Sequence, residues 1–130
     1  MARQAIDIRK LDRPGGGYRI LPSWRLSKSA YRRHKIDAWM PELAPSLQLG
    51  SQFRKGNINS EAFNKLYASE LRSPRKQNLI KPLALLSLRK HLVLLCDSIC
   101  GRHCPNRVLL QALEACRKSG VFHLNYDKAA

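Results

Sequence analysis

Cysteine, histidine and arginine residues gather between positions 96 and 107, and they can supply a nucleophile, a base and a phosphate ligand. Cys104 directly precedes Pro105, a residue that favours the first turn of a helix. A thiol at a helix N-terminus and beside cations has a lowered pKa, so it forms a reactive thiolate. One catalytic hypothesis is therefore Cys104 as nucleophile with His103 as its base. The alternative is a small apolar thiol that fills the end of the loop.

The same segment fits two other chemical patterns less well. Cys96 and Arg102 have the Cys-x5-Arg spacing of cysteine-dependent phosphatases, but Leu95 stands where those enzymes have a histidine. A zinc site would need four sulfur and nitrogen ligands, for which the candidates are Cys96, Cys100, His103 and Cys104. Structural zinc sites typically combine two neighbouring ligands with a second, distant pair, for which the chain offers only Cys116 and His123. We therefore expect no metal and no other cofactor.

A second group of chemically suitable residues follows the glycine-rich stretch at 14–17. Arginine presents a rigid donor fork to phosphate, and an indole face can stack a nucleobase. Together with arginines near the last helix, this group predicts an anion-binding pocket made of Arg19, Trp24, Arg25, Lys28, Arg102 and Arg107. The alternative is that Trp24 anchors the core while the arginines face solvent. Trp39 is expected in the core.

The overall charge also favours an anionic partner. The chain has 24 Lys and Arg against 9 Asp and Glu, a net charge of +15. Such an excess repels itself in the folded state, and a bound polyanion or phosphate would screen it. Nucleic acid and phosphorylated small molecules are the partners that this balance favours. A basic protein with no specific partner is the alternative.

The sequence contains no long apolar segment. A bilayer-spanning helix needs about 18 apolar residues, and no run approaches that length. The start also lacks the apolar stretch of a signal peptide. We therefore predict a cytoplasmic protein without a membrane partner, whose four cysteines are thiols or metal ligands rather than disulfides.

Hydrophobic periodicity and turn residues place these groups on an alternating series of elements. Strands are predicted at 5–10, 18–21 and 91–96, and helices at 28–34, from Ser60 to 71, from Pro74 onward with a kink at Pro82, and from Pro105 to about 120. Residues 14–17 are expected to form a turn, 36–46 an ordered connection and 50–59 a polar loop. This order predicts the α/β class, as a small single-domain layered sandwich with a short, mostly parallel sheet flanked by helices.

A series of short motifs resembles a known family. The motifs are residues 17–21 (GYRIL), 24–28 (WRLSK), Trp39 with 44–46 (APS), Phe63, Tyr67 and 70–71 (EL), 94–96 (LLC), and His103-Cys104-x-x-Arg107. In this order they resemble the bacterial YeaO-like proteins, domain of unknown function 488. The similarity covers about residues 5–118 of a single domain over 1–130, with 119–130 as a short extension. Residues 22–25 (PSWR) replace a longer family motif that carries an acidic residue, so a reduced site is expected.

The resemblance implies a compact α/β fold with an arginine and tryptophan cluster near its sheet, and it transfers no reaction. The best-supported function is therefore binding of nucleic acid or a phosphate-bearing ligand through the basic pocket. A cysteine-dependent enzyme acting on a nucleotide or phosphate ester is one alternative, and an interaction subunit of a larger assembly is another. Whether the protein is an enzyme stays open, as does its oligomeric state.

Overall fold

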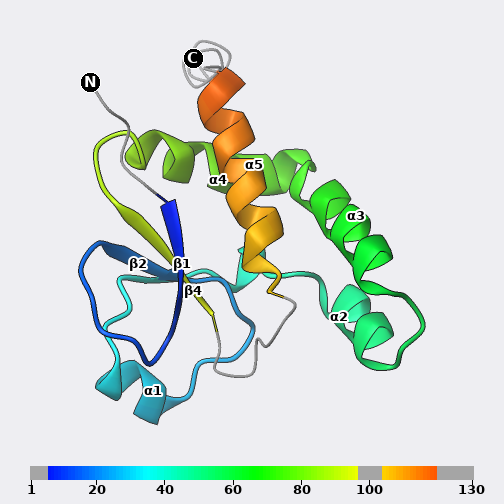
Figure 1. Cartoon of the computed structure of the whole chain (residues 1–130), viewed down its shortest axis with the longest axis horizontal. Coiled ribbons are helices and arrows are strands. Elements are labelled where there is room, and N and C mark those ends of the chain that lie inside the picture. The colour runs from blue at the N-terminus through cyan, green and yellow to red at the C-terminus, as the bar shows by residue number, and fades with distance from the viewer. Residues whose placement is uncertain (1–5, 97–103, 120–130) are drawn as a thin grey trace.

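The fold is built on a short sheet whose strands all run parallel. The computed structural model describes residues 6–96 and 104–119. Its strands form one sheet in the order β1-β4-β2-β3, where β1 is Ile6–Lys10, β2 is Tyr18–Leu21, β3 is Ala38–Trp39 and β4 is Leu92–Cys96 (Figure 1). The predicted layered α/β fold is confirmed.

The described residues also form five helices and a short 3-10 turn. They are α1 (Lys28–Arg33), η1 (Pro41–Leu43), α2 (Leu47–Arg54), α3 (Ser60–Leu71), α4 (Pro74–Leu86) and α5 (Asn106–Ser119). Side-chain oxygens of the preceding residues cap four of them, because Ser27, Ser46, Asn59 and Ser73 each accept a first-turn N–H. None of the helices described is long and apolar enough to cross a membrane.

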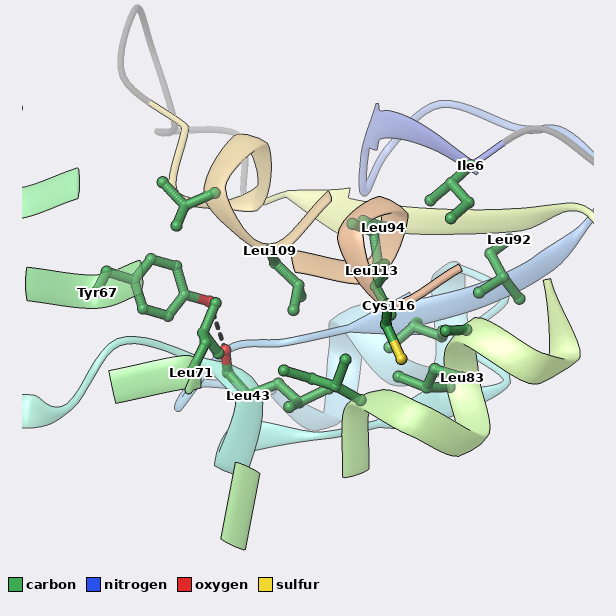
Figure 2. Close-up of a cluster of buried hydrophobic side chains, with 14 of the residues drawn as sticks. Ile6, Leu43, Tyr67, Leu71, Leu83, Leu92, Leu94, Leu109, Leu113 and Cys116 are labelled. Atoms are coloured by element: carbon green, nitrogen blue, oxygen red, sulfur yellow. Dashed lines mark hydrogen bonds between the residues drawn. The ribbon is translucent and has the colours of Figure 1, made fainter. Parts of the chain in front are cut away.

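One face of the sheet carries the main hydrophobic core. Side chains alternate between the two faces of a strand, so Leu92 and Leu94 of the fully buried β4 point to the same side. There they meet Tyr67 of α3, Leu83 of α4 and Leu109 of α5 (Figure 2). Figure 1 shows these three helices gathered together, with α1 lying apart from them. The spacing of apolar residues predicted α3, α4 and α5 correctly because this face buries them.

The opposite face of the sheet is covered by connecting segments. Leu21, Val93 and Leu95 form a second buried cluster on that side. The side chains packed against it come from the connections rather than from long helices, and they are Leu11, Leu26 and Ile36. The connections are therefore part of the core and must be held in place.

The connection from β1 to β2 crosses this second face. Strands β1 and β2 lie on the two sides of β4 and are both parallel to it. Residues 11–17 must therefore run from the carboxyl end of β1 back to the end of the sheet where β2 begins. The turn expected at 14–17 is thus the end of a crossing segment. Gly17 has φ +96°, and a Cβ there would lie 2.9 Å from Val93 Cγ2 and 3.0 Å from the His91 carbonyl oxygen. Only glycine allows so close an approach.

Arg19 fixes this crossing from inside the molecule. Its side chain is 2% exposed. The guanidinium donates to the carbonyl oxygens of Lys35 (2.7 Å), Leu11 (3.3 Å) and Gly15 (3.5 Å). The Arg19 backbone N–H donates to an Asp37 carboxylate oxygen at 2.8 Å. The expectation that Arg19 binds an external anion is therefore corrected, because its side chain is buried and three of its N–H donors bind the protein's own backbone.

Two other expectations were wrong. Residues 47–54 form helix α2 where a loop was expected from residue 50, because Ser46 caps the helix and Leu49 is buried. Trp39 was expected in the core, but its side chain is 47% exposed. It stands on the two-residue strand β3 at the end of the sheet, and its indole N–H donates to the Ser23 carbonyl oxygen at 2.7 Å.

Replacing Arg19 should destabilise the fold, because both its buried hydrogen bonds and the packing of its aliphatic stem are lost. Arg19→Ala leaves three carbonyl oxygens without their donor, so we expect the free energy of unfolding to fall by about 3 kcal/mol. Arg19→Lys should recover only part of this loss, because one ammonium cannot span three acceptors. The exposed Arg13 is the control, and Arg13→Ala should change stability by less than about 0.5 kcal/mol in urea denaturation. Equal stability of the two alanine variants would refute this role of Arg19.

Candidate functional site

A cleft of about 700 Å³ opens at the carboxyl ends of the neighbouring strands β2 and β4. In open parallel sheets this edge is where ligands bind. Its walls are made of the residues after β2, the start of α5 and one side of α2. The described residues that line it include Trp24, Arg25, Pro45, Arg54, Cys96 and Asn106.

Trp24 forms one wall of this cleft in a fixed orientation. Its indole N–H donates to the Pro45 carbonyl oxygen at 2.8 Å, while 45% of the side chain remains exposed. The next residue, Arg25, is also exposed, and its backbone N–H donates to Ser23 Oγ at 3.2 Å. An aromatic face and a guanidinium are thus presented side by side by one short segment.

Helix α3 holds residues 43–46, the segment whose Pro45 carbonyl oxygen accepts the Trp24 indole N–H. The Glu70 carboxylate accepts the Ser46 backbone N–H at 2.9 Å and the Ser46 hydroxyl at 2.6 Å. One turn earlier, the Tyr67 hydroxyl donates to the Leu43 carbonyl oxygen at 2.5 Å, drawn as the dashed line in Figure 2. Burial raises the pKa of Tyr67 well above its ordinary value, as do Glu70 and Cys104, so the hydroxyl remains a donor. Residues 43–46 are therefore fixed at both ends.

Arg54 is a cationic residue of the cleft that the sequence analysis missed. It ends α2, a helix that was expected to be a loop, so its position beside the sheet was not foreseen. A Cβ on Gly50 would lie 3.3 Å from an Arg54 guanidinium nitrogen, so the guanidinium lies close over the backbone of its own helix. The Ser46 cap followed by Leu49 and Phe53 four residues apart is the signal that identifies this helix in the sequence.

The third wall joins the end of β4 to the start of α5. Asn106 is 5% exposed, and its side-chain amide donates to the Leu95 carbonyl oxygen at 2.9 Å. Cys96 lines the cleft, although it is mostly buried. Cys104, the predicted nucleophile, is buried beside this wall and is absent from the described lining. Its predicted base His103 lies outside the described residues, as do Cys100 and Arg102.

The predicted anion-binding residues are distributed over several places. Trp24 and Arg25 are brought together in the cleft, and Arg19 is buried under the other face of the sheet. Lys28 lines a separate, neighbouring cleft. Arg107 is exposed on the first turn of α5, next to the cleft-lining Asn106 but not itself among the lining residues. The cleft thus contains part of the predicted set, with Arg54 added.

The charges along the cleft suit a negatively charged ligand. The described lining carries two guanidinium groups, Arg25 and Arg54, and no Asp or Glu. A planar donor fork binds phosphate or carboxylate through paired hydrogen bonds. Between residues 6–96 and 104–119 no group of three or more His, Cys, Asp and Glu side chains is placed to hold a metal ion. The arrangement places an exposed aromatic ring and two cationic groups along one cleft.

Loss of the Glu70 carboxylate should loosen Trp24 as well as destabilise the fold. Glu70→Ala removes both acceptors of Ser46, so we expect a loss of about 1–2 kcal/mol in unfolding free energy. The Trp24 fluorescence anisotropy should also fall, measured with Trp39→Phe as background so that one indole remains. Glu61 on the same helix is the control, because its ion pair with Lys65 is exposed and contributes little. Equal anisotropy in the Glu70→Ala and Glu61→Ala variants would contradict this role of Glu70.

Comparison with known proteins identifies the family to which the chain belongs. A family model described as the active DUF488-N3 subclade matches residues 4–117, which is nearly the whole chain. No significantly similar curated protein or solved structure was found. The match agrees with the resemblance indicated by the sequence motifs, which runs over about residues 5–118. The chain is therefore a member of the DUF488 family.

Proposed function

We propose that the cleft between β2, β4 and α2 binds a phosphate-bearing ligand with a planar ring, of the nucleotide class. In this proposal the guanidinium groups of Arg25 and Arg54 bind the phosphate, and the exposed face of Trp24 stacks on the ring. The observation that carries the proposal is their common position at the carboxyl edge of a parallel sheet, where such ligands bind in this class of fold.

Two further observations support a phosphate rather than a neutral ligand. The described cleft lining contains no acidic side chain that would repel an anion. The chain as a whole has a net charge of +15, which raises the local concentration of anions around it. Arg107, also predicted as a phosphate ligand, is exposed next to Asn106 and would contribute at the same edge, whereas Arg102 lies outside the described residues. Arg19 is not part of this proposal.

Trp24 is held in place before any ligand binds, which favours a role in ligand stacking over a purely structural role. Its N–H is already satisfied by the Pro45 carbonyl oxygen, so the ring needs no new partner and loses little freedom when a ligand binds. A tryptophan that served packing alone would bury both ring faces, whereas 45% of this side chain is exposed.

Binding can be measured by fluorescence with uridine 5′-monophosphate (UMP) as the probe. In the Trp39→Phe variant Trp24 is the single indole, and we expect UMP to quench its emission at low salt. Arg25→Ala and Arg54→Ala should each weaken binding about tenfold, since each removes one charge-assisted contact. Arg75→Ala is the control, because Arg75 is exposed at the start of α4 and is not among the cleft residues.

The outcomes of this titration are distinct. Weaker binding in the two cleft variants alone supports the proposal. An equal loss in the Arg75→Ala control would show diffuse attraction by the net charge. Absence of quenching at low salt, where charge attraction is least screened, would refute the proposed site.

We also propose cysteine chemistry in the same cleft as a second candidate function, because Cys96 lines it. A Cys96 thiolate would attack the phosphorus of a bound phosphate ester, forming an S–P bond while the alcohol leaves with a proton from solvent. Water would then break the S–P bond and release phosphate. The matching family model is described as active, which is compatible with such a role. The sequence-based candidates Cys104 and His103 belong to this second proposal.

Alkylation by iodoacetamide, followed by mass mapping of each cysteine, tests this second function. Cys116 is an internal control, since burial raises its thiol pKa and so lowers its thiolate fraction at any given pH. A reactive Cys96 or Cys104 should label faster than Cys116 near neutral pH, and UMP should slow that labelling. Labelling of both thiols as slow as that of Cys116 would remove the second proposal without affecting the first.

A further inference from the structure

A second cleft, of about 410 Å³, lies beside the first and combines aromatic and cationic side chains. Its described lining is Leu26, Ser27, Lys28, Tyr31, Arg32 and Trp39. We call the four functional side chains among them, Lys28, Tyr31, Arg32 and Trp39, the α1 shelf. As in the first cleft, no acidic residue is among the described lining.

Helical spacing brings the α1 shelf together on one side of α1. Lys28, Tyr31 and Arg32 stand at positions i, i+3 and i+4, so they share one face of the helix. Tyr31 is 60% exposed, and no residue of α1 is buried. Packing therefore does not explain why an aromatic residue stands between two cations, whereas a ligand with a flat ring and a negative charge would use all three.

The two clefts are joined through the segment that follows β2. The Trp39 indole N–H donates to the carbonyl oxygen of Ser23. Trp24, which follows Ser23 in the chain, donates its own indole N–H to the Pro45 carbonyl oxygen. The Trp39 indole is thus held by the residue that directly precedes Trp24. Arg25 and Lys28 follow along the same segment, so cationic groups continue from the first cleft to the second.

We propose that the α1 shelf binds a further nucleotide of the ligand held in the first cleft, so that the ligand is a single-stranded nucleic acid. This inference rests on the proposed function of the first cleft. A single strand offers unstacked bases to exposed aromatic faces and a phosphate between them to cations, whereas a duplex keeps its bases stacked inside. A free mononucleotide would occupy only one of the two clefts.

The test compares UMP with an eight-residue oligouridylate on the full-length chain. We expect the oligomer to bind at least about tenfold more tightly, because a second base stacks. Tyr31→Ala/Arg32→Ala removes two exposed shelf residues and should abolish this advantage while leaving UMP binding unchanged. Arg75→Ala/Arg89→Ala is the control at exposed positions outside both clefts, and it should retain the advantage.

Salt dependence adds a readout that counts phosphate contacts. For a single strand, the logarithm of the binding constant falls with the logarithm of salt concentration by about 0.7 per phosphate contact. Lys28→Ala/Arg32→Ala should therefore reduce the oligomer's slope by about 1.4. The Arg75→Ala/Arg89→Ala control should leave the slope nearly unchanged.

The outcomes show separately whether the first cleft or the α1 shelf fails to bind. If the shelf variant binds UMP normally and keeps the full oligomer advantage, the strand does not reach the α1 shelf and this inference is overturned. A duplex of equal length that competes as well as the single strand would also overturn it. If neither UMP nor the oligomer binds the wild-type chain at low salt, the proposed function of the first cleft has failed, and this inference with it.

Discussion

A buried guanidinium holds together two of the connections on which this short parallel sheet depends. Removing a charge from water is expensive unless its donors are satisfied, and the Arg19 side chain meets carbonyl oxygens from the segments before β2 and before β3. These segments must run back along the sheet to keep β1, β2 and β3 parallel. The glycine at position 17 lets the first crossing lie against Val93. The neighbouring carboxyl ends of β2 and β4, and hence the cleft, follow from that topology.

The cleft walls are held by elements that lie outside them. Helix α3 fixes residues 43–46 through Tyr67 and Glu70, and that segment in turn holds Trp24 through the Pro45 carbonyl oxygen. Asn106 joins the start of α5 to the end of β4. A binding residue that is held by hydrogen bonds before the ligand arrives loses less freedom on binding. The site is thus supported by the same core that stabilises the fold.

The sequence predicted those parts of the fold that burial determines. The continuous apolar run of β4 and the stripes of α3 and α5 were recognisable because each packs on the sheet. Helix α2 was missed because its short sequence contains Gly50 and several polar residues, which favoured a loop over the apolar signal of Leu49 and Phe53. In the candidate site, residue type alone could not separate Arg19 from Arg25. Both are arginines near the same glycine-rich stretch, and only the parallel crossing determines that one is buried among carbonyl oxygens and the other exposed.

In the function proposed for this DUF488 member, its positive charge serves a defined cleft rather than a uniformly attractive surface. Amide and indole signals in a ¹H–¹⁵N NMR titration with UMP test this claim residue by residue. We predict that the signals of Trp24, Arg25, Ser46, Gly50, Arg54 and Asn106 shift together with one dissociation constant. Small, unsaturating shifts spread over lysines and arginines on all sides of the molecule, with the cleft signals no different from the rest, would contradict the account.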